Sequence, residues 1–221
     1  MKRFVGICII CFYGSISFSQ NQTFETWVEL AVSKEISHNL SLGVVEETRF
    51  QQNGDFLKLF SGEFGLDYKI VKPLSVGITY KCSQKNKEQG FFATNTYSIN
   101  ASYKEKLGPI KLAYRNKFET SKETYINEYQ DLLYTSDDRN KLKLTYSKKG
   151  ANIEPSFSVE TFHPINNGTL YKVSEIRYGG GIWFDLPKKF ELELGVIYKK
   201  LYQVKIPEAA TILAISISKE L

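Results

Sequence analysis

Charged side chains recur in the polar phase of several alternating segments, and they are the residues of this sequence best suited to chemistry. The set contains both signs in similar number: Glu47, Arg49, Arg115, Lys117, Glu119, Glu160, Arg177, Glu191 and Glu193. Side chains two residues apart on a strand point to the same face of a sheet. If that face is enclosed, each charge needs a partner, because an unpaired buried ion is costly. We expect a ladder of ion pairs that fixes strand register, with a selective constriction or ligand site as the alternative.

The sequence offers few groups for catalysis. Its two histidines, His38 and His163, belong to no Gly-x-Ser-x-Gly or His-Glu-x-x-His pattern, and no Cys and His cluster has metal-ligand spacing. The three glycines 179–181 lie within an alternating run, which favours a bulge or close packing over bare backbone rather than a phosphate-binding loop. We therefore expect no catalytic residue, metal or cofactor. A lipid-modifying enzyme, of the phospholipase or acyltransferase type, is the alternative and would have to use one of the histidines.

These charges must be positioned by strands, because apolar and polar residues alternate with period two from Thr23 to the end of the chain. In one run, Leu74, Val76, Ile78 and Tyr80 alternate with polar or small residues. No segment of ten or more residues shows a 3.6-residue period. The pattern predicts an all-β fold, an antiparallel up-and-down transmembrane β-barrel of about 10–12 strands.

About eleven such runs can be counted, whereas bacterial single-chain barrels have even strand numbers. We expect either that one run is false or that a further strand lies within residues 123–134 or before Trp27.

The connections between runs alternate in length. Short ones with Pro or Gly lie at residues 71–73, 107–109, 148–150 and 186–188, and long polar ones at 83–90, 121–138, 163–169 and 203–208. Short turns at one end and long loops at the other are typical of outer-membrane barrels. The segment 121–138 carries tyrosines among acidic residues, so it is a candidate for recognition, with a merely solvated loop as the alternative.

The two faces of the strands differ in aromatic content. Fifteen aromatics fall in the apolar phase: Phe50, Phe60, Phe64, Tyr68, Tyr80, Tyr97, Tyr103, Tyr114, Phe118, Tyr146, Phe157, Tyr178, Phe184, Phe190 and Tyr198. Only Trp27, Phe162 and Trp183 fall in the polar phase. Many of the fifteen lie near run ends, as the aromatic girdles of membrane barrels do. We therefore expect the apolar face to point outward to lipid, and rank last a soluble binding barrel with that face inside.

The N-terminus has the pattern of a secretory signal peptide. Lys2 and Arg3 precede an apolar stretch over residues 4–14 that is too short to span a membrane, and small residues stand at Ser17 and Ser19. We expect residues 1–19 to be removed and residues 20–221 to form the barrel in the outer membrane of a Gram-negative cell. Its expected partners are outer-membrane lipid and, during biogenesis, the barrel-assembly machinery. The oligomeric state is left open.

Composition agrees with export and gives no sign of nucleic-acid binding. The chain has 29 basic and 24 acidic side chains, a net charge of +5, and removal of residues 1–19 takes two of the basic ones. Such a balance lacks the clustered positive charge of a nucleic-acid-binding protein. Of three cysteines only Cys82 lies beyond residue 19, so we expect no intrachain disulfide.

The order of several short motifs resembles one known family. Trp27, Glu47-x-Arg49, the stretch 115–119, Glu160, and Arg177 followed by Gly181 are similar to the pattern of the Bacteroidota outer-membrane proteins called domain of unknown function 2490. The resemblance covers essentially the whole chain after residue 19. It implies an outer-membrane β-barrel and no particular reaction. Where that family tends to have a second arginine, this sequence has Lys117, which keeps the charge but loses the bidentate fork.

Overall fold

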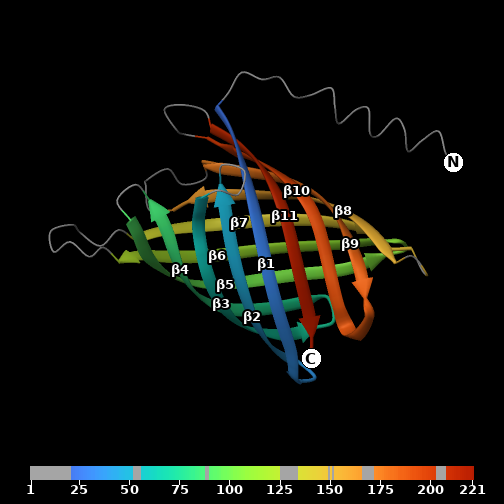
Figure 1. The fold of residues 1–221 in the computed structure, drawn as a ribbon. Coiled ribbons are helices and arrows are strands. Elements are labelled where there is room, and N and C mark those ends of the chain that lie inside the picture. The colour runs from blue at the N-terminus through green and yellow to red at the C-terminus, as the bar shows by residue number, and fades with distance from the viewer. Residues whose placement is uncertain are drawn as a thin grey trace, which may run out of the picture.

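The computed structural model describes residues 21–51, 56–87, 90–124, 134–148, 150, 152–165, 172–202 and 208–221. These residues form one closed barrel of eleven strands (Figure 1). The strands are β1 (Asn21–Ser37), β2 (Leu40–Gln51), β3 (Phe56–Val71), β4 (Leu74–Lys87), β5 (Gly90–Leu107), β6 (Ile110–Thr124), β7 (Tyr134–Tyr146), β8 (Ile153–Pro164), β9 (Glu175–Leu186), β10 (Phe190–Leu201) and β11 (Glu208–Glu220). The predicted all-β barrel of 10–12 strands is confirmed. No helix among the described residues is long and apolar enough to cross a membrane.

The expectation of an even strand number is wrong. All eleven predicted runs are strands, and β1 begins at Asn21, so the residues before Trp27 lengthen the first strand rather than add another. In a meander with an odd number of strands, the first and last run in the same direction. The barrel therefore closes through a parallel β1–β11 pair, with Thr26 opposite Leu213 and Leu30 opposite Ile217, while every other neighbouring pair is antiparallel.

The strands extend further toward the predicted long loops than the hydrophobic pattern indicates. The predicted loop 83–90 is wrong, since β4 continues to Lys87 and β5 starts at Gly90. Both ends of the predicted loop 121–138 also belong to strands, β6 and β7; residues 125–133 between them lie outside the described part of the chain. Backbone pairing continues in these ends after both faces have become polar, so apolar alternation stops before the ladder does.

The short connections lie together at the opposite end of the barrel from the predicted long loops. Two residues, His38 and Asn39, separate β1 from β2, and two separate β5 from β6. Gly108 in the latter turn has a φ of 61°, a conformation that glycine adopts without the steric cost of a side chain. A single 3₁₀ turn, Pro187–Lys189, joins β9 to β10.

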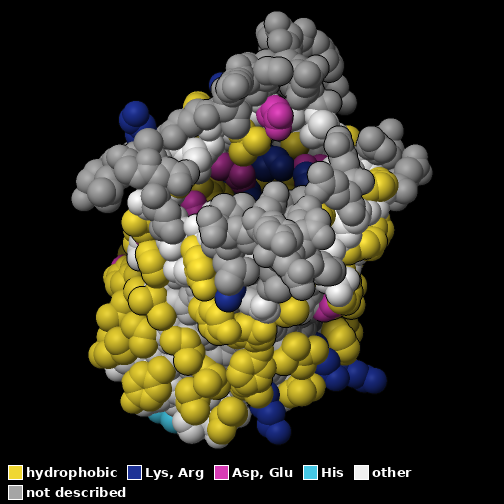
Figure 2. Space-filling view, turned by 90° about the vertical axis from the view of Figure 1, so that its left-hand side faces the viewer, with side chains coloured by type: hydrophobic (Ala, Val, Ile, Leu, Met, Phe, Trp, Pro, Cys, Tyr) yellow, Lys and Arg dark blue, Asp and Glu magenta, His cyan; other side chains and the backbone are white. Residues whose placement is uncertain are grey.

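The apolar phase of the strands faces outward, with exposed large hydrophobic side chains on every strand. Figure 2 shows part of this apolar band on the face turned to the viewer. Ile99, Tyr97 and Ile78 are 60%, 62% and 57% exposed in the isolated chain. The rings of Tyr80 and Tyr97 contact each other across β4 and β5, with centroids 5.1 Å apart. Polar and charged side chains are turned inward, and some are visible in the opening of Figure 2. The polar phase of the sequence thus lines the lumen.

Candidate functional site in the barrel lumen

Most of the predicted site residues line one cavity in the lumen, with a volume of about 420 Å³. Those in its wall are Glu47, Arg49, Arg115, Lys117, Glu160, Arg177 and Glu193. Glu119 lies beside the cavity, bonded to Arg139 of the wall. Glu191 is not part of this group: it is exposed near the β9–β10 turn and accepts a hydrogen bond from Ser218 at 3.3 Å.

On the β1–β2 side, Glu47 is held by two cations. Arg49 donates to Glu47 through Nε at 2.7 Å, and Lys81 of β4 donates to the other carboxylate oxygen at 2.6 Å. The Arg49 guanidinium also lies 3.8 Å from the centre of the Trp27 ring, a cation–π contact. The predicted motif Glu47-x-Arg49 therefore forms an ion pair along its own strand and a second pair two strands away.

A second group of ion pairs crosses β6, β7 and β8. Arg139 donates from Nη1 to both oxygens of Glu119, at 3.2 and 3.0 Å, and from Nη2 to Glu160 at 2.9 Å. Arg115 reaches the same oxygen of Glu160 at 3.2 Å. Lys117, which lacks an arginine fork, comes within only 3.6 Å of Glu63 and 3.7 Å of Glu119.

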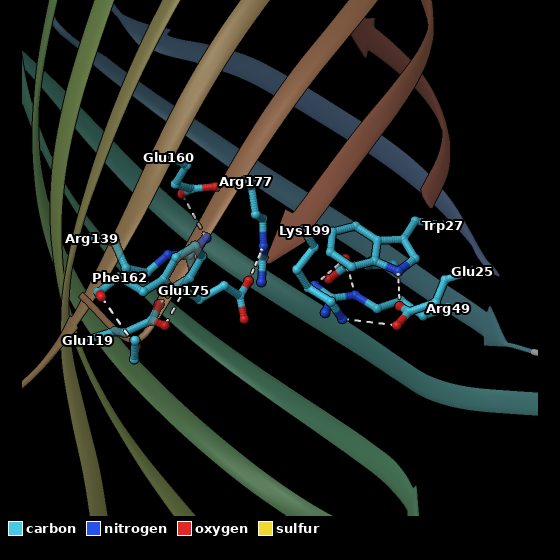
Figure 3. A network of polar contacts seen from close by, with 12 residues as sticks. Glu25, Trp27, Arg49, Glu119, Arg139, Glu160, Phe162, Glu175, Arg177 and Lys199 are labelled. Carbon is cyan, nitrogen blue, oxygen red and sulfur yellow. Dashed lines mark hydrogen bonds and ion pairs between the residues drawn. The ribbon is translucent and has the colours of Figure 1, made fainter. Parts of the chain in front are cut away.

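Arginines and aromatic rings connect these two groups in a row, the arginine–aromatic layer of Trp27, Arg177, Phe162 and Arg139 (Figure 3). Arg177 lies 5.0 Å from the Trp27 ring centre and 4.3 Å from that of Phe162, and Arg139 lies 4.5 Å from that of Phe162. Arg177 is also ion-paired with Glu175. Both rings are 8% exposed. The third aromatic of the polar phase, Trp183, also contacts a lumen cation, since Lys143 lies 4.2 Å from its ring centre.

The layer continues at one end into Glu25, whose side chain is 2% exposed. It accepts hydrogen bonds from Trp27 Nε1 at 2.9 Å, from Lys58 of β3 at 2.8 Å and from Lys199 of β10 at 2.9 Å. A fully desolvated carboxylate is retained here because two ammonium groups and an indole N–H surround it.

Sequence reasoning missed several charged lumen residues: Glu25, Glu29, Glu63, Lys81, Arg139, Lys141, Lys143 and Lys199. The same period-two signal that identified the others was available for most of them. Leu142 and Leu144 face outward, so Lys141 and Lys143 must face inward. The predicted loop to residue 138 concealed the start of β7, and with it Arg139.

The part of the wall contributed by β9 and β10 is built from small residues. β9 pairs with β8 and β10 without a register shift, so the bulge considered for the glycines 179–181 is absent. Gly179 and Gly181 face the cavity; a Cβ on Gly181 would lie 3.1 Å from a Glu193 oxygen, and one on Gly179 would lie 2.6 Å from Ser158 Oγ. Close packing of neighbouring side chains over bare backbone, the other predicted role, is what the structure has.

The two histidines lie at opposite ends of the barrel and cannot share a site. His38 is exposed in the β1–β2 turn, whereas His163 lies near the far end of β8, where its Nε2 is 3.1 Å from Thr161 Oγ1. Among the described residues, no group of three or more His, Cys, Asp and Glu side chains is arranged to hold a metal ion. Nothing in this arrangement favours the lipid-modifying enzyme.

Comparison with known proteins gives a family and a distant structural likeness. None of the curated proteins matches the chain. The β domain of the Bordetella autotransporter BrkA is similar over 75% of this chain and 78% of that one, with 9% sequence identity and a TM-score of 0.44. The family model of DUF2490, described as a protein of unknown function, matches residues 24–207. The match spans β1 to β10, the strands that carry nearly all of the lumen charges, and the chain therefore belongs to the DUF2490 family.

Proposed function

We propose that this chain is an integral outer-membrane β-barrel with a charge-paired lumen, serving as a structural or narrow transport protein. The observation that carries the proposal is the division of its two faces. The outer face carries a belt of exposed apolar side chains, which includes Ile78, Tyr97 and Ile99. The interior holds buried ion pairs such as Arg139–Glu160 at 2.9 Å. A large exposed apolar band needs an apolar environment, and a lipid bilayer supplies one around the whole barrel.

The sequence supports delivery of the barrel to that membrane. We expect residues 1–19 to act as a signal peptide in a Gram-negative cell, in the Bacteroidota as the resemblance implies. Leu213, Ile215 and Ile217 near the end of β11 are in the outward phase, which suits a strand recognised by the barrel-assembly machinery. Outer-membrane lipid would then be the permanent partner of the outer face, and mass spectrometry of the mature protein should find Gln20 as its first residue.

Two substitutions of the same kind test the membrane embedding. Ile99 of β5 lies opposite Ile78 and Phe118 within the apolar band, whereas Ile36 of β1 lies next to the β1–β2 turn; they are 60% and 56% exposed in the isolated chain. In phospholipid vesicles, Ile99→Arg should lower the free energy of unfolding by about 2–4 kcal/mol, as expected for a cation near the bilayer midplane. Ile36→Arg should cost less than about 1 kcal/mol, because that position lies near the interface.

The free energies are measured by denaturant titration of the vesicle-inserted protein. In water both positions would be exposed alike, so equal small effects of the two substitutions would contradict the proposal. Recovery of the wild type as a soluble periplasmic protein would contradict it too. Recovery in the detergent-extracted outer-membrane fraction, with heat-modifiable gel mobility, is the expected result.

A further inference from the structure

The lumen cavity has two chemically different walls. Its lining contains eight Lys or Arg side chains and five Glu side chains. The cations gather on β6 and β7, which contribute Arg115, Lys117, Arg139, Lys141 and Lys143. In the order of strands around the barrel, β1 and β2 lie on the far side, where Glu29 and Glu47 stand directly opposite each other.

Like charges on β6 and β7 are neighbours in the hydrogen-bond register. Arg115 stands opposite Lys141, and Lys117 stands opposite Arg139. Directly opposed like charges destabilise a sheet. These four cations form a square on the two strands, the cationic square. It is unfavourable unless negative charge compensates it.

The carboxylates of the protein compensate this square incompletely. Arg115 shares a single oxygen of Glu160 with Arg139, at 3.2 Å. Within the described part of the chain, the carboxylates that Lys117 approaches are those at 3.6 and 3.7 Å, beyond hydrogen-bond distance. Lys141 faces the cavity and stands opposite Glu160 in the β7–β8 register, but among the described residues it forms no hydrogen bond and no ion pair within 4.0 Å.

Next to this cationic wall the lumen is hollow rather than filled. Gly179, Gly181 and Gly195 of β9 and β10, with Ser156 and Ser158 of β8, give the cavity small side chains and hydroxyl donors. The volume of about 420 Å³ is in the range of small-molecule sites. On β7, Lys141 and Lys143 follow Arg139 toward the turn end, so the cavity lies on the turn side of the arginine–aromatic layer.

We propose that this cavity binds a small organic anion carrying phosphate or carboxylate groups, with Arg115, Lys117 and Lys141 as its principal contacts. The ammonium and guanidinium groups of β6 and β7 donate to the anion, as charge-assisted hydrogen bonds to oxyanions do. Glu29, which accepts a hydrogen bond from Ser216 at 3.1 Å, repels the anion from the far wall and keeps it at β6 and β7. The proposed site lies inside the barrel, so anion binding does not depend on whether the protein resides in the outer membrane.

Titration calorimetry of the full-length, folded protein in non-ionic detergent tests the site. The probes are inorganic pyrophosphate and citrate, which separate phosphate from carboxylate recognition, and spermidine serves as the cation control. At least one of the two polyanions should bind saturably and spermidine should not. Lys141→Met should weaken that binding about tenfold, the loss expected for one charge-assisted hydrogen bond. Glu29→Gln should tighten it.

Stability and a charge-matched variant make the test specific. Because Lys141 stands next to like charges and forms no close ion pair among the described residues, Lys141→Met should raise the midpoint of denaturation of the ligand-free barrel while it weakens anion binding. Lys189→Met removes one positive charge from an exposed ion pair with Glu220. It should change neither the midpoint of denaturation nor the affinity for the anion. Absence of saturable binding by both polyanions, or unchanged binding in Lys141→Met, would overturn the proposal. Equal weakening in Lys189→Met would do so as well, since it would indicate attraction by net charge.

Discussion

At the scale of single residues, burial separates ion pairs that hold the barrel together from those that do not. Arg139 and Glu160 have 19% and 7% of their side chains exposed, and their nitrogen and oxygen are 2.9 Å apart. Lys189 and Glu220 are the same distance apart but 62% and 53% exposed. Water screens the second pair and is excluded from the first, so only the first should matter for stability.

The Arg139→Met variant measures this difference. It removes one of the two cations that contact the Phe162 ring, leaving Arg177 there, and it removes the closest ion-pair partner from both Glu119 and Glu160. Loss of one member of a buried charge network should cost about 3–5 kcal/mol of unfolding free energy. Denaturant titration of the inserted barrel gives the value.

The matched variant is Lys189→Met, whose effect should stay below about 1 kcal/mol. Adding Glu119→Gln to Arg139→Met should recover part of the loss, because it removes one of the two carboxylates that have lost their closest cation. If the two single variants cost the same, the lumen pairs do not stabilise the barrel.

At the scale of elements, two features of the strands follow from their pairing and not from their own sequence. One is the bulge in β3, where Arg49 stands opposite Leu59 and Phe50 opposite Leu57, so that Lys58 is the extra residue that bonds Glu25. The other is the parallel closure of β1 on β11. The period-two alternation of a strand is the same whichever way the strand runs. It therefore cannot indicate whether β1 pairs with β11 in parallel or antiparallel.

Cysteine pairs test the parallel closure. In a chain beginning at Gln20 and carrying Cys82→Ser, the pair Thr26→Cys with Leu213→Cys should form a disulfide on mild oxidation, and so should Leu30→Cys with Ile217→Cys. Directly paired residues of neighbouring strands lie within the Cα separation that a disulfide requires. Non-reducing gel mobility and mass spectrometry detect the cross-link.

The exchanged pairs provide the control. Thr26→Cys with Ile217→Cys, and Leu30→Cys with Leu213→Cys, are four residues out of register in the parallel arrangement and should remain reduced. An antiparallel closure about the same centre would reverse the result, with cross-linking of the exchanged pairs alone.

At the scale of the whole molecule, we expect the arginine–aromatic layer to control passage through the barrel. Trp27 and Phe162 turn inward from β1 and β8, and Arg177 between them contacts both rings (Figure 3). We expect this row of rings and guanidinium groups to narrow the lumen at its level. The wild-type barrel should therefore conduct weakly in planar bilayers.

The Phe162→Ala variant should raise single-channel conductance, because it removes a ring from the layer. Phe157 lies on the same strand but is 50% exposed on the outer face, so Phe157→Ala removes the same side chain without touching the lumen. Conductance should be unchanged in that control. A wild type that already conducts as a wide pore, or equal effects of the two variants, would show that the layer does not close the barrel.

The sequence by itself determined the class of fold, the eleven alternating runs that became strands and the side of each strand that faces the lumen, but not that the strand number is odd. These depend on a local rule, the period-two direction of side chains along a strand, which is read directly from Leu142 and Leu144 or from Glu47 and Arg49. The strand ends next to the predicted long loops were misjudged because polar residues on both faces erase the alternation while the backbone ladder continues.

The tertiary structure alone decided which lumen charges meet. Strands in a barrel are tilted, so residues that approach one another across the lumen are set by the stagger of all eleven strands. Glu25 bonds Lys199, far away in the sequence, and the predicted Glu191 is left near a turn. Neither outcome is encoded in a single strand, because register around a closed barrel is a property of the whole ring.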